Sequence, residues 1–241
     1  MVWPPILTGR ADSTVARTAA KMTICGGFNG RTDIRFGDSV GFPFAPFWKG
    51  WQSMNIGEIL YFSPRFRFSE IDFNDAGKLI GAFRDRVEGF YLEPARRLVQ
   101  AGDAFACGLL CCASMDFLAR YQGVGGSRIT EWLKKNVPEF DEPDPQDGRR
   151  TLACRFEVDF RNGLDHEGRI KNLGQFSLDQ QTVLRFVDSG MIVNPRLLLE
   201  AIRTAFAKYC TDLHSDETVI QNLIGRLRSD FSQEIAAARA G

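Results

Sequence analysis

The stretch of residues 156–169 carries the densest group of side chains that could do chemistry at a phosphate. It contains Arg161, Asn162 and His166, and His166 is one of only two histidines in the chain. An imidazole can take up or release a proton near neutral pH, and a guanidinium can hold a phosphate through two hydrogen bonds. Together these residue types suit a proton transfer beside a bound phosphate, with Arg169 available to bind a neighbouring one.

The element that must position these side chains is an amphipathic helix, predicted at about residues 151–167. Its apolar residues recur at four-residue steps and form one ridge: Leu152, Phe156, Phe160 and Leu164. Gly168 follows at the position where glycine commonly ends a helix.

Arg161 and His166 do not share a face of an ideal helix, because five residues turn through about 500° and leave them about 140° apart. Asn162 and His166, four residues apart, do share one. A pair of Arg161 and His166 therefore needs the reach of the arginine, a local irregularity at Gly163, or a second subunit. The alternative is a plain ion pair between Arg161 and Asp165, with His166 on the wet face of the helix.

Helices are also predicted for much of the remaining chain. One starts with Asn74 as its N-cap and is expected to kink at Pro94. A second, at about residues 103–122, is apolar enough to be largely buried. A short third helix starts at Ser127, and the acidic loop of residues 139–147 is expected to lie in solvent.

The C-terminal part combines a hairpin with two further helices. Thr182–Val187 and Met191–Val193, separated by Asp-Ser-Gly, predict a β-hairpin. Asn194 followed by Pro195 is a strong signal for the start of a helix. A last helix is expected to start near Ser215.

Residues 1–70 differ from the rest because glycine, proline and phenylalanine cluster there. Short strands are expected at Thr32–Phe36 and Glu58–Phe62. The aromatic and proline-rich segment of residues 42–48 suits either an arm packed on the helices or a contact with a partner. The predicted organisation is a mainly α-helical bundle at residues 71–241, with an irregular, β-containing N-terminal extension and one inserted β-hairpin.

The composition excludes several classes of function. Thirty Lys and Arg residues balance thirty Asp and Glu residues, so the chain as a whole carries no basic footprint for nucleic acid. No apolar run reaches the roughly 20 residues of a membrane span, and the N-terminus lacks the pattern of a secretory signal. We therefore expect a cytoplasmic protein that does not bind membranes.

The six cysteines include no CxxC pair and are expected to be reduced thiols. Cys107 and Cys111 could share a helix face with Cys112 beside them, but no second pair of ligands lies near in sequence. Buried thiols are therefore favoured over a metal site, and no metal or other cofactor is expected.

The sequence Arg-Asn-Gly-Leu-Asp-His at residues 161–166 resembles the RNxxxH form of the Arg-x4–6-His motif of HEPN (higher eukaryotes and prokaryotes nucleotide-binding) domains. The resemblance covers about residues 74–238 and is carried by the motif. It implies an α-helical bundle in which two copies of the motif, from two subunits, build one site. Many members of this family are metal-independent endoribonucleases of toxin, antiphage and CRISPR-linked systems.

The resemblance implies that this protein cleaves RNA as a homodimer, with an antitoxin or other regulatory partner as a further expectation. The RNA 2′-hydroxyl would attack the adjacent phosphate and leave a 2′,3′-cyclic phosphate and a 5′-hydroxyl end. His166 would transfer the proton and Arg161 would stabilise the charge on the phosphate. Asn162 would orient the histidine or the substrate, and Arg169 would bind an adjacent phosphate. The alternative is a non-catalytic dimeric module of the same fold that binds a partner protein or a nucleotide.

Overall fold

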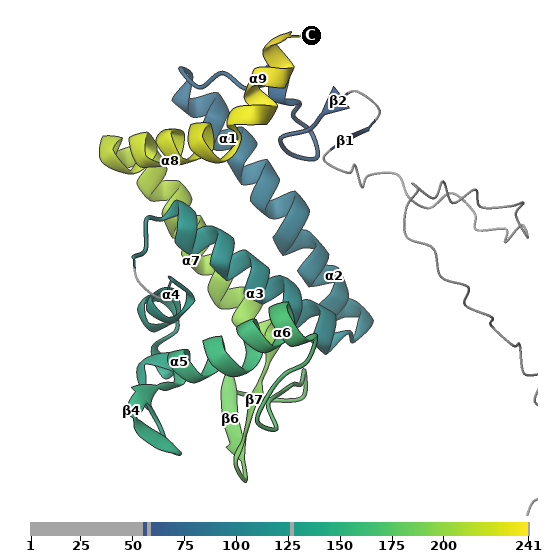
Figure 1. The fold of residues 1–241 in the computed structure, drawn as a ribbon, viewed down its shortest axis with the longest axis vertical. Helices are drawn as coiled ribbons and strands as arrows, with labels where there is room; N and C mark the ends of the chain where they lie inside the picture. The colour runs from purple at the N-terminus through teal and green to yellow at the C-terminus, as the bar shows by residue number, and fades with distance from the viewer. Residues whose placement is uncertain (1–54, 57–58, 126–127, 241) are drawn as a thin grey trace, which may run out of the picture. The chain divides into compact units, whose positions relative to one another are not determined.

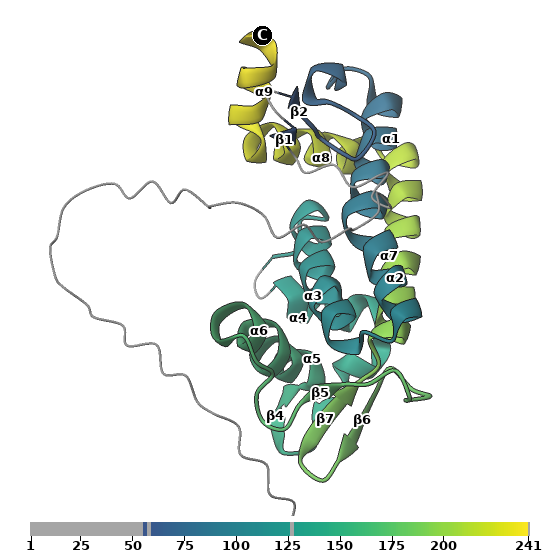
Figure 2. The same cartoon turned by 90° about the vertical axis from the view of Figure 1, so that its right-hand side faces the viewer.

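This computed structural model describes residues 55–56, 59–125 and 128–240, and helices make up most of these residues. The longest described helix is α7, Pro195–Ser215, and α3, Ala104–Tyr121, packs along it. One end of α7 adjoins the small strands and the other end meets the C-terminal helices, whereas the helix that carries residues 161–166 packs against α3 (Figures 1 and 2). The mainly α-helical fold with small β elements, predicted from the sequence, is therefore confirmed.

The first long helix is built from three consecutive segments: α1 (Ala76–Val87), the π-helical segment η2 (Glu88–Leu92) and α2 (Glu93–Ala101). Asp75, and not Asn74, is its N-cap, because the Asp75 side chain accepts the backbone N–H of Lys78. The helix widens into η2 just before Pro94, the residue at which a kink was predicted. The reason is that proline has no N–H to donate and crowds the carbonyl four residues earlier.

One stripe of α3 is less buried than its apolar sequence predicts. Phe105 is 51% exposed and Leu109 is 41% exposed, one turn apart on the same face. Ala113 and Asp116 continue this face along the helix. The prediction of a largely buried helix is therefore wrong for this stripe, although the opposite side of α3 lies in the core.

By length and apolar character α3 would suffice to cross a membrane, alone among the described helices. Half of that stretch is buried inside the protein, where it packs against α2 and α7. Asp116 and Arg120 also form ion pairs from this helix. These are properties of the central helix of a bundle.

The acidic segment that follows α4 (Arg128–Asn136) was predicted to be a loop in solvent, but part of it is ordered and buried. It forms a short 3-10 turn, η3 (Pro138–Asp141), and a two-stranded sheet of β3 (Pro143–Asp144) and β4 (Asp147–Thr151). Asp144 is buried because it pairs with Arg155, which is itself buried.

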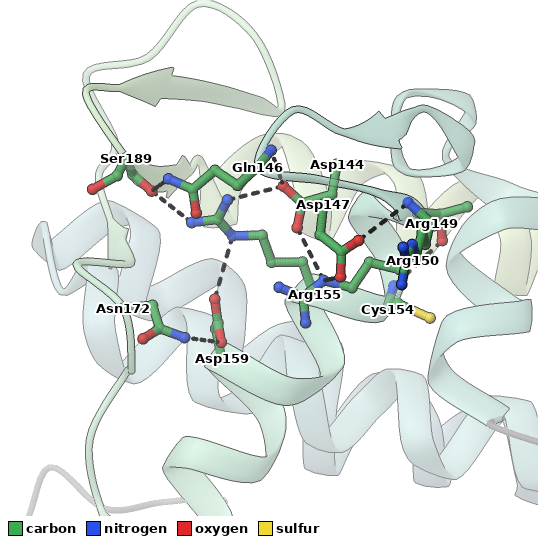
Figure 3. Close-up of polar contacts among 11 residues, drawn as sticks. Asp144, Gln146, Asp147, Arg149, Arg150, Cys154, Arg155, Asp159, Asn172 and Ser189 are labelled. Carbon is green, nitrogen blue, oxygen red and sulfur yellow. Dashed lines mark hydrogen bonds and ion pairs between the residues drawn. The ribbon is translucent and has the colours of Figure 1, made fainter.

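Arg155 is the centre of a buried network that joins three segments of the chain (Figure 3). Its Nη1 donates to Oδ1 of Asp144 at 3.1 Å, its Nε to Oδ2 of Asp159 at 3.3 Å, and its Nη2 to the carbonyl of Ser189 at 2.6 Å. The side chains of Arg155 and both aspartates are at most 2% exposed. The network therefore fixes the helix after β4 against the loop at residue 144 and the tip of the hairpin.

The predicted hairpin is confirmed as β6 (Leu184–Val187) and β7 (Gly190–Val193), which pair antiparallel. A third strand, β5 (Gln175–Phe176), pairs parallel to β7 and was not predicted, because two residues give no alternating pattern. The start of α7 at Asn194 is also confirmed. The buried Asn194 side chain accepts two backbone N–H groups of the first turn and donates to the carbonyl of Gln180.

The single C-terminal helix predicted from Ser215 is instead two helices, α8 (Glu217–Asp230) and α9 (Ser232–Ala240). The helix breaks at Phe231, whose ring packs against Phe62 and Phe68 at centroid distances of 5.9 and 5.4 Å. The break therefore coincides with packing of the Phe231 ring against residues distant in sequence. The apolar pattern of the C-terminal residues does not predict such contacts.

The described residues before α1 pack against the chain at Phe231, where α8 ends. They contain β1 (Asn55–Ile56), its partner β2 (Ile59–Leu60), which falls within the predicted strand at residues 58–62, and η1 (Phe68–Glu70). The guanidinium of Arg86 lies 4.7 Å from the ring centroid of Phe231 and 5.4 Å from that of Phe62. The predicted strand Thr32–Phe36 and the aromatic segment 42–48 lie outside the described residues.

Candidate functional site

The helix that carries the candidate residues has the predicted extent but is not a uniform α-helix. It consists of α5 (Leu152–Phe156), the π-helical segment η4 (Glu157–Arg161) and α6 (Asn162–Glu167). All four residues of the predicted ridge are buried. The helix starts where the Thr151 hydroxyl accepts the N–H of Cys154, and it ends at Gly168, whose φ of +65° favours glycine.

The segment η4 is held from two sides by the buried network around Arg155. Asp159, inside η4, accepts from Arg155 and, at 2.8 Å, from Nδ2 of Asn172 (Figure 3). The carbonyl of Asp159 also accepts the backbone N–H of Lys171 at 2.9 Å. π-Helical turns are rare and often mark functional positions. Arg161 is the last residue of this one.

The guanidinium of Arg161 is held by three side chains. Its Nε lies 3.1 Å from Oδ2 of Asp165, its Nη2 donates to Oδ2 of Asp116 at 3.1 Å, and its Nη1 donates to Oδ1 of Asn162 at 3.0 Å. These contacts with described residues use three of the five N–H donors of a guanidinium. Arg161 is 26% exposed, so a ligand that reaches it meets a cation already fixed in one orientation.

His166 and Arg169 lie apart from Arg161 within one chain. His166 is exposed in the last turn of α6, and the contacts of Arg161 with described residues do not include it. Asn162 bonds to Arg161, and the exposed Arg169 pairs with Glu167 at 2.8 Å. The structure thus brings Arg161 and Asn162 together, and the Arg161–Asp165 ion pair of the alternative interpretation is present.

The helical irregularity considered at Gly163 lies one turn earlier, in η4, and residues 162–167 are regular α-helix. The turn that separates Arg161 from His166 is thus made of α6, for which an ideal α-helix gives an angle of about 140°. Gly163 is required for a different reason. A Cβ at this position would lie 2.4 Å from the carbonyl oxygen of Arg169 and 3.3 Å from Cγ of Lys171, because the chain folds back over the helix.

A cavity of about 350 Å³ lies beside Arg161, between α3 and the two helices that contain π-helical segments. Two aromatic side chains, Tyr91 and Phe117, form part of its wall. Its charged lining consists of Asp116, Arg120, Arg128, Arg161 and Asp165. Tyr91 belongs to η2 and Arg161 to η4, so each of these two π-helical segments places one side chain in the same cavity.

Cys112 also lines this cavity, but it is poorly suited to act as a nucleophile. Burial raises the pKa of its thiol far above the usual range, and Asp165 adds to the rise while Arg161 opposes it. The thiol therefore stays protonated, and the thiolate is the reactive form.

The other two thiols of α3 are buried as predicted and contact backbone. The Sγ atoms of Cys107 and Cys111 lie 3.8 and 3.6 Å from the carbonyl oxygen of Pro195, to which each can donate. Within the described part of the chain, no three or more His, Cys, Asp or Glu side chains are grouped as metal ligands would be.

Sequence reasoning missed four polar residues of this cavity, Asp116, Arg120, Arg128 and Tyr91. A signal for the first two was present, because they are the only charged residues in the apolar sequence of α3. Tyr91 had no such signal, since its direction depends on the wide turn of η2.

Comparisons of the chain with protein families, with curated proteins and with solved structures find no match.

Proposed function

We propose that the protein is a homodimeric, metal-independent endoribonuclease of the HEPN type. The observation that carries this proposal is the arrangement on residues 152–167. Arg161 is held beside a cavity by Asp116 and Asp165, and the exposed His166 follows on the same helix. The motif thus offers a phosphate-binding cation and a proton-transfer group, which are the two functions that cleavage of RNA requires.

In the proposed reaction RNA supplies its own nucleophile. The 2′-oxygen forms a bond to the adjacent phosphorus, and the bond from phosphorus to the 5′-oxygen breaks. His166 accepts the proton of the 2′-hydroxyl, and the leaving 5′-oxygen takes a proton from water. Arg161 donates to the phosphate oxygens on which charge builds up, Asn162 holds Arg161 in position, and Arg169 binds a neighbouring phosphate.

The proposed site is completed by a second copy of the chain. An ideal α-helix separates positions 161 and 166 by about 140°, and the guanidinium of Arg161 is held by Asp116 and Asp165, so we infer that one chain does not direct both Arg161 and His166 at the same phosphate. The surface beside them has the character of an interface. Phe105 and Leu109 are exposed on the α3 face that leads to Asp116, and Val158, 42% exposed, lies one turn before Asn162.

The variant Leu109→Glu tests this interface. A buried charge at an apolar contact is strongly unfavourable, so we expect a monomer and a loss of RNA cleavage of about tenfold or more. Size-exclusion chromatography with light scattering gives the mass, and a cleavage assay gives the activity. Val187→Glu is the matched control, since Val187 is 44% exposed on the hairpin, and it should leave both unchanged. A Leu109→Glu protein that stays dimeric would remove this face from the proposal.

The direct test of the function is incubation of the wild-type protein with single-stranded RNA in excess EDTA. We expect fragments with 2′,3′-cyclic phosphate and 5′-hydroxyl ends, and no cleavage of DNA of the same sequence, which lacks the 2′-hydroxyl. Cleavage that disappears in EDTA, or fragments with 5′-phosphate ends, would contradict the proposed mechanism.

A second candidate is a non-catalytic dimeric module of the same fold. The observation that favours it is the pairing of Arg161 with two carboxylates inside one chain, which neutralises the cation that a phosphate would use. Under this alternative Asp116 and Asp165 keep Arg161 occupied, and the protein binds a partner without cutting RNA. Removal of the competing carboxylate by Asp165→Asn should then leave the protein inactive on RNA, as the wild type would be.

A further inference from the structure

The cavity beside Arg161 has the size and the walls of a site for a small planar ligand. Its volume of about 350 Å³ lies within the range of small-molecule pockets. One wall is aromatic, formed by Tyr91 and Phe117. The charged wall includes three arginines, which recognise phosphates through paired hydrogen bonds.

Tyr91 is a rigid stacking surface, because other rings support it from behind. Its ring packs on that of Phe117 with centroids 5.1 Å apart and planes 30° apart, and Phe117 packs in turn on Phe83 at 5.9 Å. Phe83 is fully buried, so the stack is anchored in the core. Burial raises the pKa of the Tyr91 phenol, against the opposing effect of Arg86, so the ring stays neutral near pH 7.

The arginines of the cavity differ in how far they are already neutralised. Arg161 pairs with Asp116 and Asp165, and Nε of Arg120 donates to Asp230 at 2.8 Å. Arg128 is exposed, and no carboxylate within the described ranges pairs with it. Arg128 is therefore the cation of this lining that a phosphate can bind without displacing an aspartate.

We propose that this cavity is a nucleotide subsite, in which a base stacks on Tyr91 and a phosphate of the same RNA strand binds Arg128. The position of the subsite rests on the proposed function, because Arg161 would hold the cleaved phosphate at its edge. A base has a flat face for the tyrosine, and the adjoining phosphate has the charge for the arginine. The two π-helical segments then serve one purpose, since η2 directs the stacking ring and η4 directs the arginine toward the same substrate.

Binding of a fluorescent 2′-O-methyl RNA oligomer to the full chain tests the subsite without any dependence on cleavage, because this probe has no free 2′-hydroxyl. We expect Tyr91→Leu to weaken binding by about tenfold, as loss of one stacked base does, and Tyr91→Phe to bind as the wild type does. Arg128→Gln should also weaken binding and reduce its dependence on salt, whereas Arg185→Gln, on the exposed face of β6, should do neither.

Substitution of the half-buried Tyr91 can disturb the fold, so thermal unfolding of each variant accompanies the titration, and the exposed Arg128 provides a second, independent variant. Equal affinity of wild type, Tyr91→Leu and Arg128→Gln would overturn the subsite. If the wild type fails to cut RNA but binding depends on Tyr91 and Arg128, the subsite stands and the nuclease assignment falls. If the wild type cuts RNA but binding does not depend on Tyr91 or Arg128, the nuclease assignment stands and the subsite falls.

Discussion

His166→Ala is expected to lower the rate of RNA cleavage by about 10²–10⁴-fold, the usual contribution of a general acid or base. The folded protein should be as stable as the wild type, because His166 is exposed and surface substitutions of this kind change stability by about 0.5 kcal/mol or less. The measurement is the initial rate of cleavage in EDTA together with the unfolding temperature. His214→Ala is the matched control, since it removes the only other histidine, also exposed, at the end of α7.

The composite site makes a sharper test possible with Arg161→Ala. Each single variant should be inactive, but a co-refolded equal mixture of Arg161→Ala and His166→Ala subunits should recover a measurable part of the wild-type rate. Half of the dimers in such a mixture are mixed, and only in these does the composite site contain an intact arginine and an intact histidine, which come from different subunits. A mixture that stays inactive would place both residues in one chain, contrary to the proposal. Full activity in either single variant would remove that residue from the mechanism.

The helix of residues 152–167 shows how much of the candidate site was accessible from sequence. Its apolar ridge predicted the extent of the helix and its buried face, because four-residue periodicity determines which side of a helix is buried. Periodicity did not reveal η4, since ridge residues stay four apart through it. The π-helical turn is instead accompanied by hydrogen bonds that Asp159 accepts from Asn172 and Lys171, which lie beyond the end of the helix.

Two of the misassigned segments, Asp144 and β5, depend on a partner elsewhere in the chain. Asp144 was expected in solvent because its neighbours are acidic, yet it is buried against Arg155. β5 depends on a parallel neighbour, β7, that follows it by more than a dozen residues. Phe105 and Leu109 were expected in the core, and their exposure is informative, because an apolar stripe that the described residues leave uncovered is a surface that a second copy would bury.

Arg155→Met is expected to destabilise the protein by about 3–5 kcal/mol, because it leaves Asp144 and Asp159 buried without their shared cation. For a chain of this length such a loss lowers the unfolding temperature by roughly 10 °C. Arg150→Met is the matched control. Arg150 contacts the same Asp144, at 3.1 Å, but is 36% exposed, so its loss should cost about 1 kcal/mol or less. Equal costs for the two variants would show that burial does not set the strength of this network.

The pH dependence of the same variant provides an independent check on Asp144. Burial raises the pKa of this carboxyl, but the hydrogen bonds from the Gln146 N–H and from Arg155, with the charges of Arg155 and Arg150, lower it below the usual value. A lowered folded-state pKa means that its contribution to stability is present above the unfolded value and is lost as pH falls through the folded one.

Arg155→Met removes one hydrogen bond and one charge that lower the pKa of Asp144 but leaves the burial that raises it, so this pKa should be higher in the folded variant than in the wild type. The difference in unfolding free energy between wild type and Arg155→Met should therefore shrink as the pH is lowered from 7 to about 4. Denaturant unfolding at both pH values measures it. A difference that is constant with pH would mean that lost packing of the arginine side chain, and not the uncompensated carboxylates, explains the destabilisation. Since Asp159 lies in η4, this variant should also reduce RNA cleavage under conditions where it is still folded, by loosening the turn that places Arg161.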